Sequence, residues 1–332
     1  MIDDLFNMLK NIAVLTSGGD NAGLNAVIRA VTRAGEKLGV GVYGVRSGYR
    51  GLVEGQIIPL NSNKVSGTIQ LGGTWLGTAR LPEWRDPKVR RKAIRNMNLS
   101  SIEGLIVIGG NGSLAGAYNL FKDGFPVIGI PGSIDDDVYG TEVCLGVDTA
   151  LNIIIEAIDR IRDCASSIQR AFVIEVMGRD CGALAQMAAT ATGAEVCLIP
   201  EEKGKVSMED IAKTLMDAYT KGKSHAICVV AEGWKPGALE LVKFLNQKQE
   251  ETGFDIRETV LGYTQRGGAP TARDRIYGTL MGASAITSLV NGESGKVVSI
   301  VDGQVQLTPL ENVIGKLKPV SKHLIQLYND LD

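Results

Sequence analysis

Short apolar runs that end at glycine recur along the chain and constrain its fold more than any other feature. The first four are rich in valine and isoleucine and lie at residues 11 to 20, 39 to 45, 104 to 110 and 126 to 132. A helical pattern follows the first run, with Val27, Ile28 and Val31 at helical spacing. Continuous apolar strands that alternate with helices are typical of a parallel sheet covered on both faces. The predicted fold class is therefore α/β.

A second series of the same kind begins after a long helical pattern that starts near Asp148. Its strand candidates lie at residues 171 to 178, 195 to 200 and 225 to 233. The series predicts a second α/β lobe, a boundary near residue 146 and a cleft between the lobes. We expect the chain to cross back after residues 262 to 268.

The composition favours a globular protein that binds small molecules. The 332 residues include 44% hydrophobic and 22% charged residues, with a net charge of −2. Without a basic segment there is no electrostatic case for nucleic acid or an anionic membrane surface as a partner. No apolar run approaches the roughly 18 residues that span a bilayer, so we expect a cytoplasmic protein without a membrane partner. The two histidines, His225 and His323, make a histidine-based metal site or triad improbable.

Five widely spaced cysteines lack any CxxC pair. Most have apolar neighbours, which predicts buried, reduced thiols. They are Cys144, Cys164, Cys181, Cys197 and Cys228.

Three glycine-rich loops follow apolar runs, at residues 16 to 23, 109 to 117 and 131 to 137. In an open α/β sheet such loops lead into helix N-termini whose free N–H groups bind phosphate. Any one loop alone is more typical of a tight turn, but three together, one of them carrying three carboxylates (residues 135 to 137), indicate a phosphate site. Those carboxylates need a cationic partner, either a metal or arginines, because unpaired carboxylates repel one another.

Arginines beside glycines supply the positive charge and indicate a second phosphorylated ligand, although each alone is typical of a surface charge. They are Arg80, Arg85, Arg170, Arg179, Arg257 and Arg266.

Together these motifs resemble the phosphofructokinase family. "GGDNAGLNA", "GGTWLGTAR", "IGGNGS", "PGSIDDD", "QRAFVIEVMGR" and "VLGYTQRGG" follow the family's order and spacing over nearly the whole chain. The resemblance implies a glycolytic kinase, a transferase that moves a phosphoryl group from MgATP to the 1-hydroxyl of fructose 6-phosphate. It implies two similar Rossmann-like lobes with mainly parallel sheets and an active-site cleft between them. Residues 1 to 146 plus 265 to 315 would bind ATP, and residues 147 to 264 plus 316 to 332 the sugar phosphate.

The resemblance also implies roles for individual residues. The ATP site would contain Gly19, Tyr49, Arg80, Arg85, Gly110, Asn111, Gly112, Ser113 and Gly116. The sugar site would contain Ser133, Asp135, Asp137, Arg170, Met177, Gly178, Arg179, Glu232, Arg257, Tyr263 and Arg266, with Arg170 and Arg257 reaching in from a neighbouring subunit. Asp135 would be the general base, and Arg80, Arg179 and Ser133 the other catalytic residues. Mg²⁺ would be held near Asn111 and Asp137.

Several positions depart from the family pattern. The family's aspartate in "GGDGS" is Asn111, which removes a charge expected to help hold Mg²⁺, and its asparagine between the two aspartates is Asp136. In an extended segment Asp135 and Asp137 would share one side and Asp136 the other. Tyr263 replaces a common histidine. Gly112 and Gly132 agree with the ATP-using branch, because pyrophosphate-dependent members usually carry Asp and Lys there.

The resemblance further implies a homotetramer and an ADP or phosphoenolpyruvate effector, at Arg29, Arg33, Arg162, Glu195, Lys221 and Lys223. Ser62 stands at a position where the family has an arginine of the effector site. The bland alternative is that these cations are surface charges on helices. Three other functions remain open: a catalytically weakened regulatory or binding subunit, a pyrophosphate-dependent phosphofructokinase, and a nicotinamide dehydrogenase, for which the glycine spacing is poor.

Overall fold

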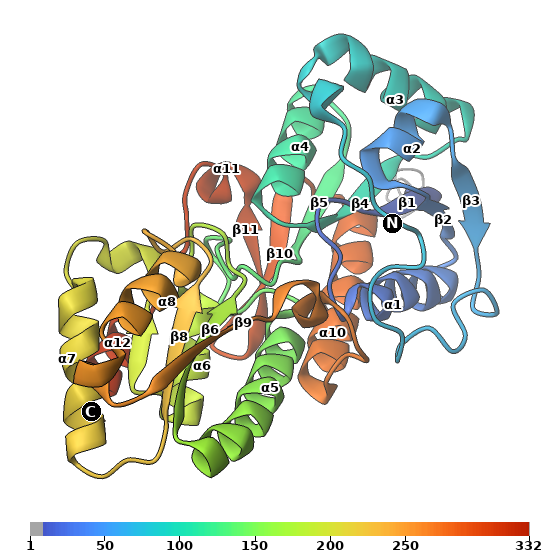
Figure 1. Cartoon of the computed structure of the whole chain (residues 1–332). Coiled ribbons are helices and arrows are strands. Elements are labelled where there is room, and N and C mark those ends of the chain that lie inside the picture. The colour runs from blue at the N-terminus through green and yellow to red at the C-terminus, as the bar shows by residue number, and fades with distance from the viewer. Residues whose placement is uncertain (1–8, 332) are drawn as a thin grey trace. The chain divides into compact units, whose positions relative to one another are not determined.

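The computed structural model of the chain describes residues 9 to 331, which form two compact units. Unit 1 comprises the residues up to Ser133, together with Asp137–Thr149 and Arg266–Lys318. Unit 2 comprises Ile134–Asp136, Ala150–Gln265 and the residues from Pro319 onward. Each unit combines a sheet with flanking helices (Figure 1), so the predicted α/β fold is confirmed.

Unit 1 is built on a seven-stranded sheet in the order β11-β10-β5-β4-β1-β2-β3. Its strands are β1 (Asn11–Thr16), β2 (Gly41–Val45), β3 (Ile57–Leu60), β4 (Gly104–Gly109), β5 (Val127–Pro131), β10 (Lys296–Val301) and β11 (Gln304–Pro309). Neighbours run parallel except in the pairs β2/β3 and β10/β11. In the centre of the sheet Val14 lies beside Ile106, which lies beside Ile128. The carboxyl ends of β1, β4 and β5 therefore meet at one edge, where the glycine-rich loops begin.

Helices cover both faces of this sheet (Figure 1). They are α1 (Leu24–Lys37), α2 (Gly48–Glu54), α3 (Pro87–Leu99), α4 (Asn111–Lys122), α10 (Ala272–Val290) and α11 (Leu310–Val313). On one face α1 and α10 pack together, because Gly278 and Gly282 have no side chains: a Cβ at Gly282 would lie 2.8 Å from the Val27 carbonyl oxygen. The apolar sides of α1 and α10 meet Val14 and Ile106 in a continuous core.

Unit 2 has a fully parallel four-stranded sheet in the order β7-β8-β6-β9. Its strands are β6 (Arg170–Val176), β7 (Val196–Leu198), β8 (Ala226–Ala231) and β9 (Asp255–Val260). The helices are α5 (Val147–Ile168), which begins in unit 1, α6 (Ala183–Thr192), α7 (Met208–Thr220), α8 (Ala238–Gln247), α9 (Gln249–Thr252) and α12 (Lys322–Leu331). One face of the sheet packs Val173 and Val230 against Leu215 of α7 and Leu241 of α8.

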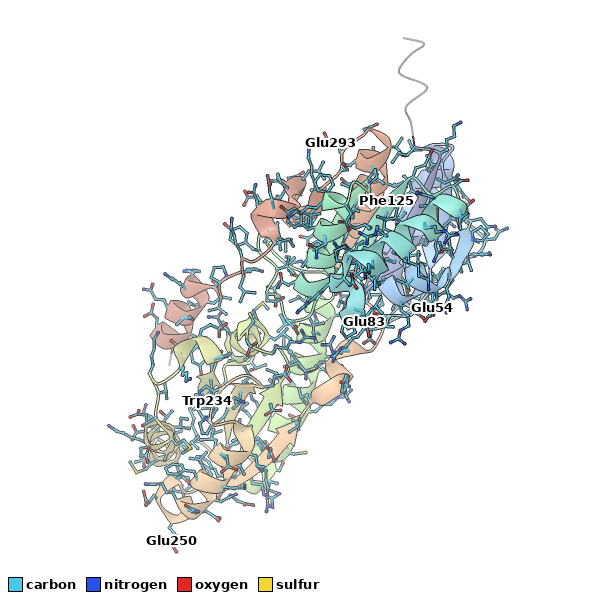
Figure 2. All side chains as sticks on the ribbon, turned by 90° about the horizontal axis from the view of Figure 1, so that it is seen from above. Glu54, Glu83, Phe125, Trp234, Glu250 and Glu293 are labelled. Atoms are coloured by element: carbon cyan, nitrogen blue, oxygen red, sulfur yellow. The ribbon has the colours of Figure 1, made fainter. Side chains whose placement is uncertain are left out.

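Side chains divide between interior and surface as their polarity dictates. Phe125 and Trp234 are buried, whereas Glu54, Glu83 and Glu250 are exposed (Figure 2). No helix within residues 9 to 331 combines the length and the apolar character that a membrane span requires.

All five cysteines are free thiols. The prediction of burial is confirmed for Cys144, Cys181 and Cys228, and Cys197 is half-buried. It is wrong for Cys164, which is exposed on α5.

Candidate functional site

The loop after β4 presents the start of α4 at the sheet's carboxyl edge. All six residues of β4 are buried, and Gly110 precedes the helix as its N-cap. The first N–H groups of a helix have no partner within the helix and favour anions. A Cβ at Gly112 would meet no atom within 4 Å, so the space beside this helix end is open. The predicted phosphate-binding glycines and Ser113 therefore lie together at one accessible helix terminus.

An aromatic pair braces this helix end from behind. The rings of Tyr49 and Trp84 stack with their centroids 4.1 Å apart. The Tyr49 hydroxyl donates to the Ser113 carbonyl at 2.7 Å, and the Trp84 indole N–H donates to the Gly116 carbonyl at 3.1 Å. Burial raises the pKa of Tyr49 well above its usual value, so its hydroxyl remains a donor. Tyr49 thus holds the loop from the buried side, and Trp84 is a supporting residue that sequence reasoning missed.

Arg80 and Arg85 lie on a segment fixed near the end of β1. Thr78 donates its hydroxyl to the Gly18 carbonyl at 2.8 Å. Both arginines are exposed. Their carbonyl oxygens accept bonds from Arg50 and Arg90. Neither guanidinium forms a salt bridge with another part of the described chain. Both are therefore available to an anionic ligand.

Arg266 packs on the first glycine-rich loop in unit 1. Its Nη1 donates to the Asp20 carbonyl at 3.0 Å, and the residue is 9% exposed. A Cβ at Gly19 would lie 2.4 Å from the same Nη1, so glycine is required there for the arginine to approach. The structure thus brings together Gly19, predicted for ATP, and Arg266, predicted for the sugar phosphate.

The acidic segment after β5 is a turn, so the expected extended alternation of its side chains is wrong. Ile134 and Asp135 form a turn, and Asp136 has a left-handed φ of 54°. Asp135 and Asp136 are both buried, whereas Asp137 is half-exposed. The segment Ile134–Asp136 belongs to unit 2, whereas Ser133 and Asp137 on either side of it belong to unit 1.

A buried carboxylate and a guanidinium meet in unit 2. The Asp135 Oδ2 lies 3.4 Å from the Arg179 Nε, and the side chains are 5% and 60% exposed. A partner of opposite charge at this distance favours the ionised carboxylate. Asp135 thus lies next to a cation that remains open to solvent on its other side.

Glu232 holds the backbone of the Arg179 loop. Its Oε1 accepts from the Gly178 N–H at 3.1 Å and from the Arg179 N–H at 2.7 Å. The loop is strained, since Gly178 has φ 142° and Arg179 has φ 52°. Met177 donates its N–H to the Gln265 side chain at 3.0 Å. The resemblance makes Glu232 a ligand contact, and the structure gives it a positioning role.

Three further sugar-site candidates lie in unit 2: Arg170 begins β6, Arg257 lies on β9, and Tyr263 follows β9. Tyr263 is 81% exposed. Asp255 accepts from Arg170 Nε and from Arg257 Nη2, each at 2.8 Å. One carboxylate therefore organises the two arginines that were predicted to serve a neighbouring subunit. Sequence reasoning missed Asp255, for which no motif gave a signal.

The effector candidates are divided between the units. Arg29 and Arg33 lie on α1 in unit 1, while the other four lie in unit 2: Arg162, Glu195, Lys221 and Lys223. Lys223 pairs with Glu195 at 3.0 Å. Ser62 bonds the Glu36 carboxylate through both its hydroxyl and its N–H, which lowers the pKa of Glu36. Ser62 thus binds the Glu36 carboxylate of α1 at the position where the resemblance implies an arginine.

The predicted metal position contains one carboxylate and one carboxamide. Asn111 donates its Nδ2 to the Asp137 carbonyl at 3.3 Å, which brings the two residues together in unit 1. Within residues 9 to 331, no group of three or more His, Cys, Asp or Glu side chains is arranged to hold a metal ion. The contact involves the Asp137 backbone carbonyl, and the Asp137 carboxylate and the Asn111 amide oxygen are oxygen donors of the kind that Mg²⁺ uses together with substrate phosphates.

Comparisons with known proteins agree with this geometry. A family model described as phosphofructokinase matches residues 11 to 289. A protein of Lysinibacillus sphaericus named ATP-dependent 6-phosphofructokinase is 49% identical over 297 residues, which cover 90% of this chain and 91% of that protein. One of the same name from Natranaerobius thermophilus is 47% identical over 323 residues, covering 97% of this chain and 99% of that protein.

A solved structure agrees as well. Phosphofructokinase from Pichia pastoris in the T-state is 38% identical, with a TM-score of 0.86 over 92% of this chain. The match covers 35% of the Pichia chain, so this chain spans about a third of that length. Because the family model covers most of the sequence and relatives nearly half identical match almost all of it, the chain belongs to the phosphofructokinase family.

Proposed function

We propose that the protein is an ATP-dependent 6-phosphofructokinase, which transfers the terminal phosphoryl group of ATP to the 1-hydroxyl of fructose 6-phosphate and releases fructose 1,6-bisphosphate and ADP. Membership of the family and the names of the most similar relatives support this activity. The observation that carries it is the buried Asp135 carboxylate beside the half-open Arg179 guanidinium. This pair supplies both a base for an alcohol and a cation for phosphoryl oxygens.

In the proposed reaction Asp135 accepts the proton of the attacking hydroxyl as the new O–P bond forms. General bases act within hydrogen-bond reach and must be ionised, and the Arg179 partner favours that state. Arg179 and Arg80 stabilise the charge that spreads over the phosphoryl oxygens during transfer. Glu232 supports the step indirectly, because it fixes the N–H groups of Gly178 and Arg179.

We infer that Asp137, with the Asn111 amide oxygen, holds the Mg²⁺ that accompanies ATP. When bound, the metal supplies positive charge to the phosphate oxygens. The Asn111 amide already donates to the Asp137 carbonyl, an orientation that leaves its oxygen as an acceptor. A lone carboxylate would give weaker metal binding than the aspartate pair of the family pattern.

Gly112 and Gly132, the two glycines linked to the choice of phosphoryl donor, differ in whether packing requires glycine. A Cβ at Gly132 would lie 3.2 Å from Leu24 and 3.4 Å from Ile108, so packing alone favours glycine there. A Cβ at Gly112 would meet no protein atom within 4 Å, so packing does not require glycine. We assign that open space to the nucleotide, which makes Gly112 the more informative position for donor choice.

A donor comparison tests the proposal. Purified protein is incubated with fructose 6-phosphate and Mg²⁺, with either ATP or pyrophosphate, and fructose 1,6-bisphosphate is measured. We expect turnover with ATP and little with pyrophosphate. Turnover with pyrophosphate alone would instead establish the pyrophosphate-dependent alternative. Binding of both ATP and the sugar without product, at any Mg²⁺ concentration, would support the weakened binding subunit that Asn111 raises as an alternative. The homotetramer, the ADP or phosphoenolpyruvate effector and the cytoplasmic location stay predictions.

A further inference from the structure

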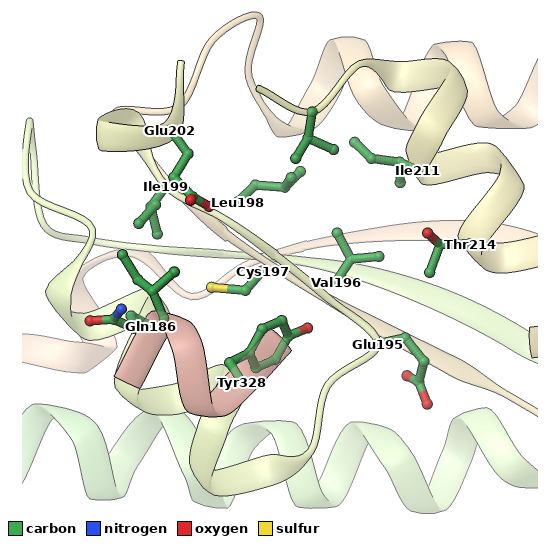
Figure 3. A pocket seen from close by; sticks show the side chains of 12 residues that line it. Gln186, Glu195, Val196, Cys197, Leu198, Ile199, Glu202, Ile211, Thr214 and Tyr328 are labelled. Atoms are coloured by element: carbon green, nitrogen blue, oxygen red, sulfur yellow. The ribbon is translucent and has the colours of Figure 1, made fainter. Parts of the chain in front are cut away.

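Unit 2 contains a pocket of about 140 Å³ that none of the proposed catalytic or substrate-binding residues line. It lies beside β7, the edge strand of the four-stranded sheet, and α7 and α12 supply further walls (Figure 3). In the close view the Cys197 thiol points into the space, with the Tyr328 ring on one side and Ile199 on the other. Of the residues predicted for other ligands, Glu195 also lines this pocket.

Two hydrogen bonds hold the C-terminal helix over the pocket. The Tyr328 hydroxyl donates to the Ala194 carbonyl at 2.7 Å. The Gln186 side chain, which is 3% exposed, donates to the Ser321 carbonyl at 3.0 Å, just before α12 begins. The wall formed by α12 is thus fixed at both of its ends. The cavity is therefore preformed and does not depend on a ligand for its shape.

The size and lining of the cavity fit a small organic ligand. Apolar side chains line the pocket on both faces of β7: Val196, Leu198 and Ile211 on the α7 side, and Cys197 and Ile199 on the α12 side. A cavity of about 150 Å³ is large enough for a molecule the size of benzene. The pocket therefore matches one small ring or a branched aliphatic group.

The charge at the pocket favours a cation. Glu195 and Glu202 contribute carboxylates to the lining, and neither lysine nor arginine lines the pocket. Glu195 is already engaged, because it pairs with Lys223 and accepts from the Ile227 N–H at 2.7 Å. Glu202 has one weak cationic contact, with the exposed Lys205 at 3.4 Å. Glu202 is therefore the carboxylate able to receive a second positive charge.

The pKa of the Cys197 thiol is consistent with negative charge from the neighbouring glutamates. Its pKa is raised to about 12, mainly by burial and to a smaller extent by the charges of Glu202 and Glu201. The thiol is therefore neutral near pH 7 and forms part of the apolar wall. A ligand with a negative group would meet the same field as the thiolate and would be disfavoured.

We propose that this pocket is a binding site for a small organic monocation, a benzene-sized apolar group that carries one ammonium directed at Glu202. The apolar part would lie between β7 and α12, and the ammonium would face the Glu202 side of the pocket.

Three ligands of matched shape test the charge preference: benzylammonium, benzyl alcohol and benzoate. Their binding to the full chain is measured by ligand-observed NMR or calorimetry at pH 7.5. For fragments of this size we expect a Kd on the order of 1 mM for benzylammonium. Benzyl alcohol should bind about fivefold to tenfold more weakly, and benzoate more weakly still. Equal binding of benzoate and benzylammonium would overturn the proposal.

Variants locate the binding. Glu202→Gln removes the charge but keeps the shape, so benzylammonium should bind about fivefold to tenfold more weakly while benzyl alcohol is unaffected. Glu209→Gln is the matched control, because Glu209 is exposed on α7 and does not line the pocket. Ile325→Trp on α12 fills the space between β7 and α12 and should abolish binding of both ligands. If that variant unfolds, Cys197→Met on β7 provides a second way to fill it.

A chemical readout uses two cysteines of the native chain. N-ethylmaleimide should modify the exposed Cys164 quickly and the half-buried Cys197 slowly, with each site followed by peptide mass spectrometry. Benzylammonium at saturation should slow modification of Cys197 at least fivefold and leave that of Cys164 unchanged. Binding of benzylammonium that persists in the filled variants, or that leaves the rate at Cys197 unchanged, would refute this location. Kinase activity in the same preparation is a separate measurement, so failure here would leave the proposed function standing.

Discussion

The two regions proposed to bind anionic groups are built by different means. At the start of α4 in unit 1 the binding groups are backbone N–H donors, braced by the Tyr49 and Trp84 side chains. In the Arg179 loop of unit 2 the binding group is a charged side chain on a left-handed backbone, held by Glu232. The first depends on the position of a helix, and the second on the geometry of a few side chains. We therefore expect changes in the first region to act through stability and ATP affinity, and changes in the second to act through catalysis and sugar affinity.

The Asp274 carboxylate in unit 1 shows how far hydrogen-bond donors without a cation stabilise a buried anion. The buried Asp274 carboxylate accepts from the Gly146 and Thr149 N–H groups at 2.8 and 2.9 Å, and from the Thr149 hydroxyl. Its pKa is nevertheless raised, because desolvation outweighs these bonds. Two backbone donors and one hydroxyl thus leave a buried anion incompletely stabilised. A phosphate at α4 would need the additional charge of Arg80, Arg85 or a metal.

The largest expected effect comes from Asp135→Asn. It removes the proposed base but retains the shape, so kcat should fall by about a thousandfold. Asp136→Asn is the control, since asparagine tolerates the left-handed backbone at that position, and kcat should change less than tenfold. Steady-state kinetics of both variants checks this. Equal losses would mean that the charge of the turn matters rather than Asp135 itself. Unchanged Mg²⁺ dependence in Asp136→Asn would show that Asp136 does not compensate for Asn111.

A pair of glycines on α4 should separate stability from ligand binding. A Cβ at Gly116 would lie 2.9 Å from Tyr49 and 3.0 Å from Trp84, so Gly116→Ala should destabilise the protein by about 2 kcal/mol. Gly112→Ala meets open space and should leave the melting temperature unchanged or slightly higher, while the KM for ATP rises severalfold. Thermal melting and ATP titration measure the two effects. An unchanged KM for ATP in Gly112→Ala would contradict the proposal that the nucleotide occupies the space beside Gly112.

Glu232→Gln should weaken the Arg179 loop without abolishing the reaction. Glutamine keeps one acceptor oxygen but loses the charge that strengthens both N–H bonds. A loss of about 1 to 1.5 kcal/mol corresponds to a rise of about tenfold in the KM for fructose 6-phosphate. The KM for ATP should stay the same. A rise in both values would show that the two regions do not act separately.

Trp84→Phe should have a smaller effect on the first region. Phenylalanine keeps the stacking on Tyr49 but loses the N–H bond to Gly116, which contributes about 1 kcal/mol. We expect a modest loss of stability in urea unfolding and a twofold to fivefold rise in the KM for ATP. Kinetics for fructose 6-phosphate should be unaffected. An intact KM for ATP would limit the aromatic pair to a role in folding.

The smallest effect is a pH dependence at Asp274. Its pKa is raised in the folded state, so as pH rises from about 3.8 through the folded pKa the unfolded chain releases this proton first and stability falls. Asp274→Asn cannot titrate. The unfolding free energy of the wild type, measured relative to this variant in urea, should therefore decrease as pH rises through that window. An increase would mean that the backbone N–H bonds fully offset desolvation.

The sequence predicted the central strands well and the edges poorly. The Val- and Ile-rich runs correspond to β1, β2, β4 and β5 in unit 1 and to β6, β7 and β8 in unit 2. Three strands without a prediction, β3, β9 and β11, lie at sheet edges, where one side is exposed and polar residues are tolerated. The fourth, β10, joins β11 through a hairpin at Asp302 and Gly303. A search for strand-glycine-helix units does not detect a hairpin.

Within the candidate site, backbone features were easier to predict than side-chain contacts. The glycines at 110, 112 and 116 marked the helix end because glycine itself is the signal. The Trp84 brace left no comparable signal, since it depends on packing between segments more than 30 residues apart. The prediction of an extended segment at Asp136 was wrong for a related reason. Asp136 has a positive φ, and the run of three aspartates after an apolar strand does not distinguish a turn from an extended segment.

The seven-stranded sheet of unit 1 takes two of its strands, β10 and β11, from beyond residue 295. During synthesis β6 to β9 therefore leave the ribosome before β10, the second partner of β5, has been made. Until α10 emerges, the apolar side of α1 has no cover, and the nascent chain exposes it to solvent. The four-stranded sheet of unit 2 would thus be complete before the sheet of unit 1, and a ribosome stalled near residue 265 would present an incomplete unit 1 sheet to chaperones.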